Sequence, residues 1–318
     1  MRDTLARRAR TDVVGLLQVA GVYLAIALLL GFNLVFTPNF ATVTNLRLQL
    51  VQVAPVAIVA IGMALVIATE GIDLSVGSTM AISAALLPLY LGYGVWVAIV
   101  ISLLAGVAVG AVNGSLIAFA GMQPIIATLG LLVAGRGVAL VFAEGRLTEV
   151  FDPTLDVLGN DAVLGVPISV LLVLLTTGAA AIAVRRTAFG RRLLATGGNR
   201  AAATLAGLPV KRTLITVYVL SGLLAAVAGL LTTARQGASD PSFVGLLIEL
   251  SAITAVVVGG TPLSGGRIRI LGTLMGALLM QLITATVIQQ NLPDSTARMI
   301  QATIIVAAVY LQRGRSTA

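Results

Sequence analysis

The chain has 318 residues, of which 58% are hydrophobic and only 10% are charged, and its mean hydropathy is +1.05. Soluble domains carry about 25% charged residues, so this composition excludes an ordinary soluble fold. The long apolar runs lack the strict alternation of a membrane β-barrel, which predicts an all-α integral membrane protein with a single membrane domain, 1–318.

The sequence contains no Cys and no His, and Lys211 is its only lysine. These absences remove thiol and imidazole catalysis and the usual zinc or haem ligands, so no catalytic residue, cofactor or metal site is predicted. No G-x-x-x-x-G-K-[ST] phosphate loop surrounds Lys211, so ATP hydrolysis would need a separate subunit. The net charge of +8 comes from arginines beside apolar runs, which favours membrane topology over nucleic-acid binding.

The apolar pattern predicts about ten transmembrane helices, of which the first follows a basic N-terminal segment, 1–12. The apolar run of this first helix is longer than the 7–15 residues of a secretory signal, so it is expected to stay uncleaved. The predicted spans are 13–36, 50–69, 74–93, 95–119, 123–143, 165–184, 213–234, 243–260, 270–290 and 296–312. An even number of spans leaves both termini on one side, here the cytoplasmic side.

The stretch A-T-E-G-I-D-L-S-V-G-S, 68–78, places Glu70 and Asp73 between the second and third predicted spans. One interpretation is a turn at the membrane surface, with glycines that break the helix and acids that mark the water boundary. In a second interpretation, Asp73 with Ser75 caps the third helix and lines the inner part of a translocation pathway, because caps satisfy backbone donors near lipid. Proton coupling is a third hypothesis, and Glu70 is expected to be the more dispensable acid.

Glycine spacing predicts close helix contacts at two places, 106–114 and 272–280, where small residues recur four apart. Two turns share a sequence pattern: G-I-D-L-S-V-G at 71–77 and G-T-P-L-S-G-G at 260–266 both read G-x-x-L-S-x-G. With ten spans, both turns lie on the cytoplasmic side. An inverted repeat would place matching turns on opposite sides, so this similarity is not evidence for one.

A pathway for an uncharged polar solute needs hydrogen-bonding side chains with little fixed charge. Asn113, Arg136 and Gln281 are the candidates inside the predicted spans, beside Asp73 and Ser75. Each has a structural alternative, because Asn113 and Gln281 can form interhelical hydrogen bonds and Arg136 can extend to the outer surface or pair structurally. Glu249 is expected to be a hydrated acid at the outer end of its span.

The charges segregate between the two sides of the predicted topology. Fifteen of the twenty basic residues fall on the cytoplasmic side, seven of them within 185–212. The loop 144–164, expected outside, carries five acids instead: Glu144, Glu149, Asp152, Asp156 and Asp161. This distribution follows the positive-inside rule.

Within 185–212 lies the signature of a short surface helix. A Gly-Gly break precedes Asn199, a good N-cap, and an alanine-rich segment follows that Gly207 ends and Pro209 prevents from continuing. So short a helix is marginal in water, which favours a docking element over a plain basic loop. The residues expected to couple this loop to a partner are Gly198, Asn199, Arg200, Ala202, Ala203 and Gly207.

Several motifs in one order resemble the sugar permeases of bacterial ATP-binding cassette importers of the ribose and galactofuranose type. They extend from about residue 45 to 312 and comprise G-I-D-L-S-V-G, Asn113–Gly114, T-L-G at 128–130 with Arg136–Gly137, A-T-G-G-N-R-A-A-A-T-L-A-G-L-P-V at 195–210, and G-G-x-x-x-x-G-G at 259–266. The N-terminal 45 residues match nothing specific.

The resemblance implies a transport subunit in the bacterial inner membrane, not an enzyme. Its implied partners are a cytoplasmic ATPase, an extracytoplasmic sugar-binding protein and a second permease copy or paralogue, with lipid around them. Related branched-chain amino-acid permeases are one alternative. An ion-coupled secondary transporter is another, which the absence of His and the scarcity of mid-span acids disfavour.

Overall fold

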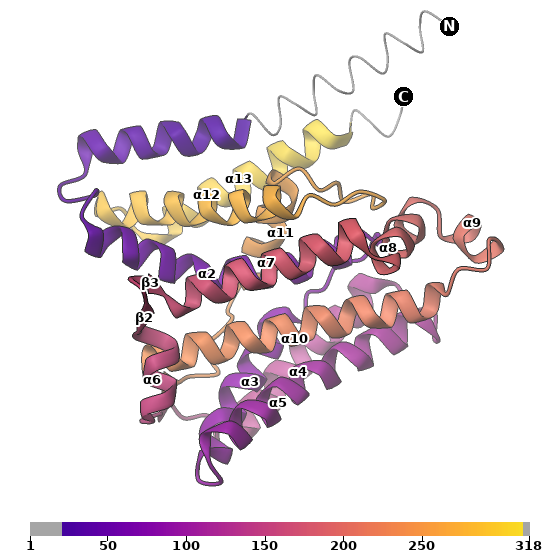
Figure 1. Ribbon diagram of the computed structural model, residues 1–318, viewed down its shortest axis with the longest axis horizontal. Coiled ribbons are helices and arrows are strands. Elements are labelled where there is room, and N and C mark those ends of the chain that lie inside the picture. The colour runs from indigo at the N-terminus through magenta and orange to yellow at the C-terminus, as the bar shows by residue number, and fades with distance from the viewer. Residues whose placement is uncertain (1–20, 314–318) are drawn as a thin grey trace, which may run out of the picture.

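The computed structural model describes residues 21–313, and these form an all-helical bundle with four very short strands (Figure 1). The predicted basic segment 1–12 lies outside the described residues. Each of the ten predicted spans contains a helix in the described region, and six of these helices are long and apolar enough to cross a membrane alone. The other four include the helix Gly21–Phe36 and two short helices that enter the bundle only part-way.

The main helices after Gly21–Phe36 are α2 (Val43–Ile67), α3 (Val76–Leu91), α4 (Val95–Ala118), α5 (Pro124–Phe142), α7 (Ile168–Arg186), α10 (Val210–Gln236), α11 (Ile248–Val258), α12 (Ile270–Gln289) and α13 (Asp294–Arg313). Three short helices connect them: α6 (Pro153–Asn160), α8 (Ala188–Gly198) and α9 (Arg200–Leu205). Antiparallel strand pairs join β1 (Thr148–Glu149) to β4 (Ala238–Ser239) and β2 (Ala162–Val163) to β3 (Val166–Pro167).

Helices α6 and α9 mark opposite ends of the molecule, called here the α6 end and the α9 end (Figure 1). Helix α2 begins at the α6 end, where Arg47 donates to the backbone oxygen of Asn160, 2.9 Å away. It ends at the α9 end, where the amide of Gly266 donates to the oxygen of Ala68 at 3.0 Å. Helix α10 runs the opposite way and reaches the α6 end, where Val150 N–H donates to the oxygen of Gly237.

Helices α3 and α11 both begin inside the bundle, after non-helical segments that turn inward from opposite ends. The segment 68–75 enters from the α9 end, and 237–247 enters from the α6 end. The first turn of α3 meets the segment that precedes α11, because a side chain at Gly77 or Gly245 would overlap the other glycine's backbone oxygen. Irregular backbone at membrane depth is tolerated only where protein buries it or it lines a water-filled cavity, as these contacts provide.

These two inward segments carry a shared motif, D-L-S-V-G at 73–77 and D-P-S-F-V-G at 240–245. In each, the Asp Oδ1 accepts the N–H of the Ser two residues later at 3.0 Å. The helices α2–α5 and α10–α13 therefore run in opposite senses around matched broken helices, the arrangement of an inverted repeat. The similar pattern at 260–266 takes no part in this match.

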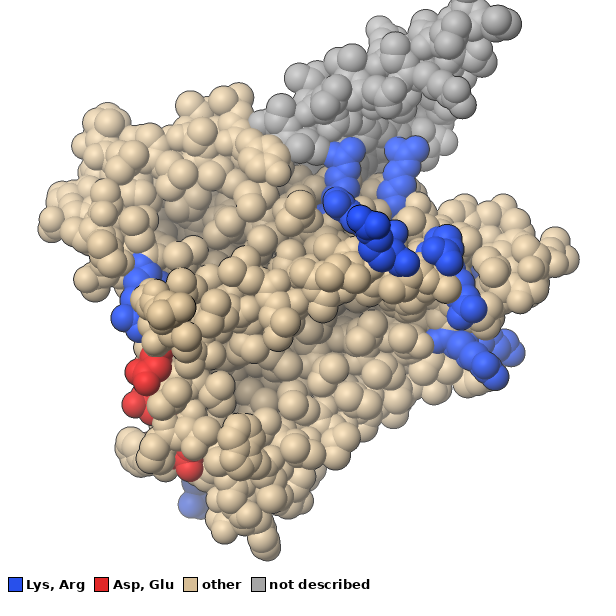
Figure 2. Space-filling model, in the orientation of Figure 1, with Lys and Arg blue, Asp and Glu red and all other residues tan. Residues whose placement is uncertain are grey.

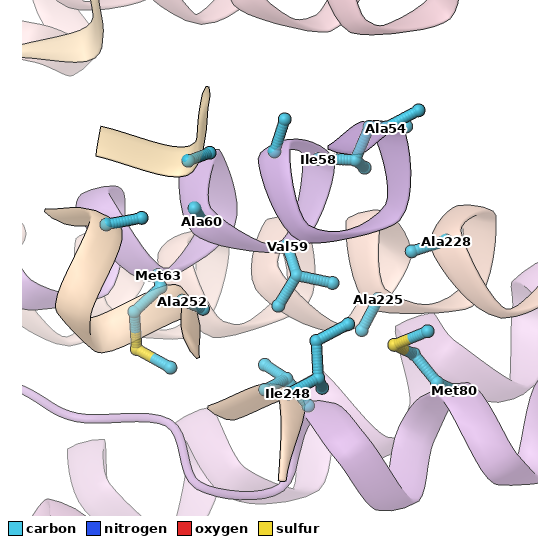
Figure 3. Packing of buried hydrophobic residues seen from close by; sticks show 14 of the residues in the cluster. Ala54, Ile58, Val59, Ala60, Met63, Met80, Ala225, Ala228, Ile248 and Ala252 are labelled. Atoms are coloured by element: carbon cyan, nitrogen blue, oxygen red, sulfur yellow. The ribbon is translucent and has the colours of Figure 1, made fainter. Parts of the chain in front are cut away.

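The core lies where α2, α3, α10 and α11 cross (Figure 3). Alanines occupy much of the contact, and the larger Ile58, Met63, Met80 and Ile248 fill the spaces between them. Because lipid is as apolar as a protein core, association of helices depends on close packing, which small residues permit. The short α3 and α11 are held by this packing, since they lack the length to be stable spans alone.

The predicted glycine contacts are confirmed. Gly106 and Gly110 on α4 lie against the backbone of α10, where an added Cβ would overlap the oxygens of Gly222 and Tyr218. On α12, Gly276 packs in the same way against Ala255 of α11. The glycines of 106–114 therefore hold α4 close to α10, and those of 272–280 hold α12 close to α11.

Candidate functional site

The predicted residues Asp73, Ser75 and Asn113 are brought together in one buried hydrogen-bond network. Asp73 Oδ1 accepts from Ser75 Oγ at 2.6 Å as well as from Ser75 N–H, and Oδ2 accepts from Ser221 Oγ at 2.8 Å. Asn113 Nδ2 donates to Ser75 Oγ at 2.7 Å. The network joins the start of α3 to α4 and α10, and each of the four residues is at most 1% exposed.

The surface-turn interpretation of 68–78 holds for Glu70 and is wrong for Asp73. Glu70 is exposed at the α9 end, whereas Asp73 lies in the interior because the segment turns inward before α3 begins. Asp73 closes a turn onto Ser75, and Ser75 is the N-cap residue of α3 without a side-chain cap bond of its own. Thr128 of α5 adds a bond to the oxygen of Ile72, so a fourth helix holds the segment.

Ser221 was not singled out in the sequence, because it sits in an apolar helix with no local signal. Two further groups near the network are buried without a partner among the described residues: Asn113 Oδ1 and the hydroxyl of Tyr218. Tyr218 packs against Gly71 of the inward segment. The network is thus tightly enclosed and leaves no room for a solute in this conformation.

Arg136 lies apart from that network and holds the other inward segment. Its Nη1 donates to the backbone oxygens of Pro241 and Val244, at 2.7 Å each. The expectation for Glu249 is wrong, because this acid is only 6% exposed in the first turn of α11. Within the described region its Oε2 accepts no hydrogen bond, and a side chain at Gly77 would meet it. The helix N-terminus, which favours negative charge, explains why an acid is tolerated there.

Gln281 lies in a third place, on α12 facing α2. Its Nε2 donates to Gln49 Oε1 at 2.9 Å and to Gln52 Oε1 at 2.8 Å. The structure therefore brings three of the five pathway candidates together and leaves Arg136 and Gln281 separate. It also adds Gln49, which the sequence analysis did not single out.

The predicted short helix in 185–212 is confirmed as α9. Asn199 is its N-cap and accepts the N–H of Ala202 at 2.8 Å, and Gly207 follows the helix with φ of +73°, in the left-handed region. Ala203 is buried in a cluster that includes Leu193 of α8. The rest of the helix is presented outward from the bundle (Figure 1).

Helix α8 touches both turns beside it at the α9 end. Gly197 lies against the backbone oxygen of Ala68 and the amide of Gly266, so that even a Cβ would overlap them. Gly265 packs against Glu70 in the same contact. A displacement of α8 would therefore press directly on the segment 68–75, which carries Asp73 and Ser75 near its inner end.

Charge separates along the same axis (Figure 2). Most basic residues in this view gather at the end carrying α8 and α9, and acidic residues gather at the end carrying α6, where a few basic residues such as Arg47 are exposed as well. The exposed basic residues of the α9 end include Arg185, Arg186, Arg191, Arg192, Lys211, Arg212, Arg267 and Arg269. The α6 end exposes Glu144, Glu149, Asp156 and Asp161.

Comparison with protein families identifies the family of this chain. A family model described as "Branched-chain amino acid transport system / permease component" matches residues 45–309. The chain belongs to this permease family. The match covers both inward segments, α8 and α9.

Several relatives of this chain are named as sugar permeases. The chain is 38% identical to the ribose import permease of Escherichia coli over 91% of each chain. It is also 38% identical to the galactofuranose transporter permease of E. coli, over 83% of this chain and 78% of the relative, and to the fructose import permease of Bifidobacterium longum, over 80% and 73%. No solved structure matches the permease. It is a multi-pass membrane protein and a transport component.

Proposed function

We propose that this permease is the membrane-spanning subunit of an ATP-binding cassette importer in the bacterial inner membrane. It passes a sugar that an extracytoplasmic binding protein delivers. The relatives named for ribose, galactofuranose and fructose favour a sugar over the branched-chain amino acids of the family description. Since the chain has no phosphate loop, a separate ATPase supplies the energy.

The observation that carries the proposal is the exposed α8–α9 element. Helix α9 presents an apolar side chain, Leu205, that is 90% exposed at the basic α9 end. A helix this short gains little from its own backbone bonds, so a partner surface is its natural stabiliser. In the proposed role, Gly207 is the joint after α9, Asn199 and Ala203 hold the helix, and Arg200 and Ala202 face the ATPase. Gly198 lies in the last turn of α8, where it has no positive φ, so a glycine is not required at that position.

The α9 end then faces the cytoplasm and the α6 end faces the binding protein. The charge distribution supports this orientation, because basic residues are retained on the cytoplasmic side. With ten spans, both termini are cytoplasmic. Helices α4, α5 and α7 are largely exposed, which leaves room for lipid and for a second permease, either identical or a paralogue.

Orientation is tested with single introduced cysteines, for which the native chain offers no background. Asp156→Cys at the α6 end should react with an impermeant maleimide in intact cells, and Arg191→Cys at the α9 end should react only after the membrane is opened. Both positions are exposed, so lack of reaction reports the side of the membrane. Labelling of position 191 but not of position 156 in intact cells would show that the permease has the opposite orientation in the membrane.

The proposed function itself is tested in proteoliposomes that contain the permease, its ATPase and its binding protein. Leu205→Asp should weaken ATPase binding by about tenfold, because it replaces an apolar anchor with an unpaired charge. The matched control is Leu164→Asp, at a side chain that is 99% exposed at the opposite end, and ATPase binding should be unchanged. Sugar uptake by the permease alone, driven by an ion gradient, would disprove the proposal.

A further inference from the structure

Helix α7 presents an apolar face that stays exposed on the outside of the bundle. The exposed side chains of this face are Leu171, Leu174, Leu175, Ala179 and Ile182. They recur at the spacing i, i+3, i+4, i+8 and i+11, which places them on one side of the helix. From Leu171 to Ile182 the helix rises about 16 Å, close to the hydrocarbon depth of one membrane leaflet, about 15 Å.

The same face of α7 ends on two exposed arginines, Arg185 and Arg186. At 3.6 residues per turn, they lie on either side of the apolar line and continue that face beyond Ile182. In Figure 2 the surface over the middle of α7 is uncharged, and basic side chains cover its end beside α8. The positive-inside rule explains cations beside a span, but it does not require them to share a face with exposed apolar side chains.

A second pair of arginines follows the first after a sharp turn. The chain bends into α8 so closely that a Cβ at Gly190 would overlap the backbone oxygen of Val184. Arg191 and Arg192 come next, and both are exposed. Among the described residues none of the four arginines has an ion-pair partner, and the sequence contains no acid from 162 to 239. Four like charges within eight residues repel one another, so an anion among them would stabilise this corner.

We propose that the exposed face of α7, with the four arginines at its end, binds an anionic phospholipid. An acyl chain lies along the apolar side chains, and the phosphate lies among the guanidinium groups, each of which can bond two phosphate oxygens at once. Each basic residue beside an anionic membrane surface raises affinity about fivefold. The binding depends on no transported solute, and only the choice of the cytoplasmic leaflet rests on the proposed orientation.

Neither of the two protein partners that meet the permease fits this surface as well. The proposed ATPase contact is α9, whereas Arg185 and Arg186 end a helix long enough to span the membrane, at the depth of the lipid headgroups. A second permease in the same orientation would bring its own basic end beside these arginines, and like charges would meet across the interface. An anionic lipid matches both the apolar face and the charge at its end.

Fluorescence quenching by brominated lipids measures binding at this face. Ala179→Cys carries a bimane label about 10 Å along α7 from the arginines, and the chain has no other cysteine. The purified permease is placed in phosphatidylcholine nanodiscs that contain brominated phosphatidylglycerol or brominated phosphatidylcholine, without ATPase or binding protein. Phosphatidylglycerol should bind about tenfold more strongly than phosphatidylcholine. This preference should fall at least about threefold between about 0.05 M and about 0.5 M salt, because salt screens the charges.

Arg185→Gln with Arg186→Gln should lower the preference for phosphatidylglycerol about tenfold. The control, Lys211→Gln with Arg212→Gln, removes the same charge from exposed positions on α10, and the preference should stay. Equal quenching by the two lipids, or equal effects of the two double variants, would overturn the inference. Protection of the label from both lipids would overturn it too, because a second permease then covers α7. If the arginine variant does not assemble, the salt series with the native arginines decides, and a preference unaffected by salt contradicts the proposal.

Discussion

Gly197→Ala is expected to abolish ATP-driven uptake, whereas Gly198→Ala is expected to retain it. A Cβ at position 197 would overlap the backbone of Ala68 and Gly266, while a Cβ at position 198 would have no atom within 4 Å. Overpacking against backbone costs about 1–3 kcal/mol or displaces one of the elements. Here the displaced elements are α8 and the segment 68–75, the direct connection between the docking element and the interior.

Gly198→Ala is a matched control for Gly197→Ala, because the two glycines are adjacent in the same helix. Both positions lie in α8, and alanine is the better helix former at each by about 1 kcal/mol. Helix propensity therefore predicts a gain in both variants, and any loss in Gly197→Ala reports the contact. Uptake and ATP hydrolysis are measured on the same assembled complex. We expect hydrolysis without uptake, and equal uptake in both variants would contradict a coupling role for the contact.

Asp73→Leu is expected to destabilise the permease by about 3 kcal/mol and to abolish uptake. The substitution leaves the Ser75 N–H, the Ser75 hydroxyl and the Ser221 hydroxyl without their acceptor in a site that is 1% exposed. The two hydroxyls can turn to nearby backbone oxygens, but the N–H has no such freedom. The measurement is the unfolding temperature in detergent, together with the amount of inserted protein.

Asp73→Asn should be tolerated, with a loss of about 1 kcal/mol or less. The amide oxygen still accepts from Ser75 N–H, and the amide nitrogen donates to Ser221 Oγ once that hydroxyl turns. Glu70→Gln, at the exposed end of the same segment, serves as the control for charge and should be neutral. If Asp73→Asn abolishes uptake in a stably inserted protein, the carboxylate charge is itself required and proton coupling replaces the structural explanation.

The sequence alone determined the features that depend on local or compositional signals. Its apolar content specified a helical membrane protein, and its arginine and acid distribution matched the two ends of the structure. The cap at Asn199 and the stop at Gly207 predicted α9, because helix ends are set by residues within a turn of them. Glycine spacing likewise identified which face of α4 meets another helix.

Only the tertiary structure decided the depth at which each polar group lies. One interpretation placed Asp73 at the membrane boundary, and Glu249 was expected to be a hydrated acid. Instead, Asp73 is buried among α3, α4 and α10, and Glu249 is buried against Gly77, where the two inward segments meet. Ser75, the local partner of Asp73, was named from the sequence, but Ser221 is 148 residues from Asp73 and Gln49 is 232 residues from Gln281, so no local pattern predicts these two contacts. A polar residue in a membrane segment has the same local sequence whether it faces lipid, water or a partner, and only the packing of distant helices distinguishes these cases.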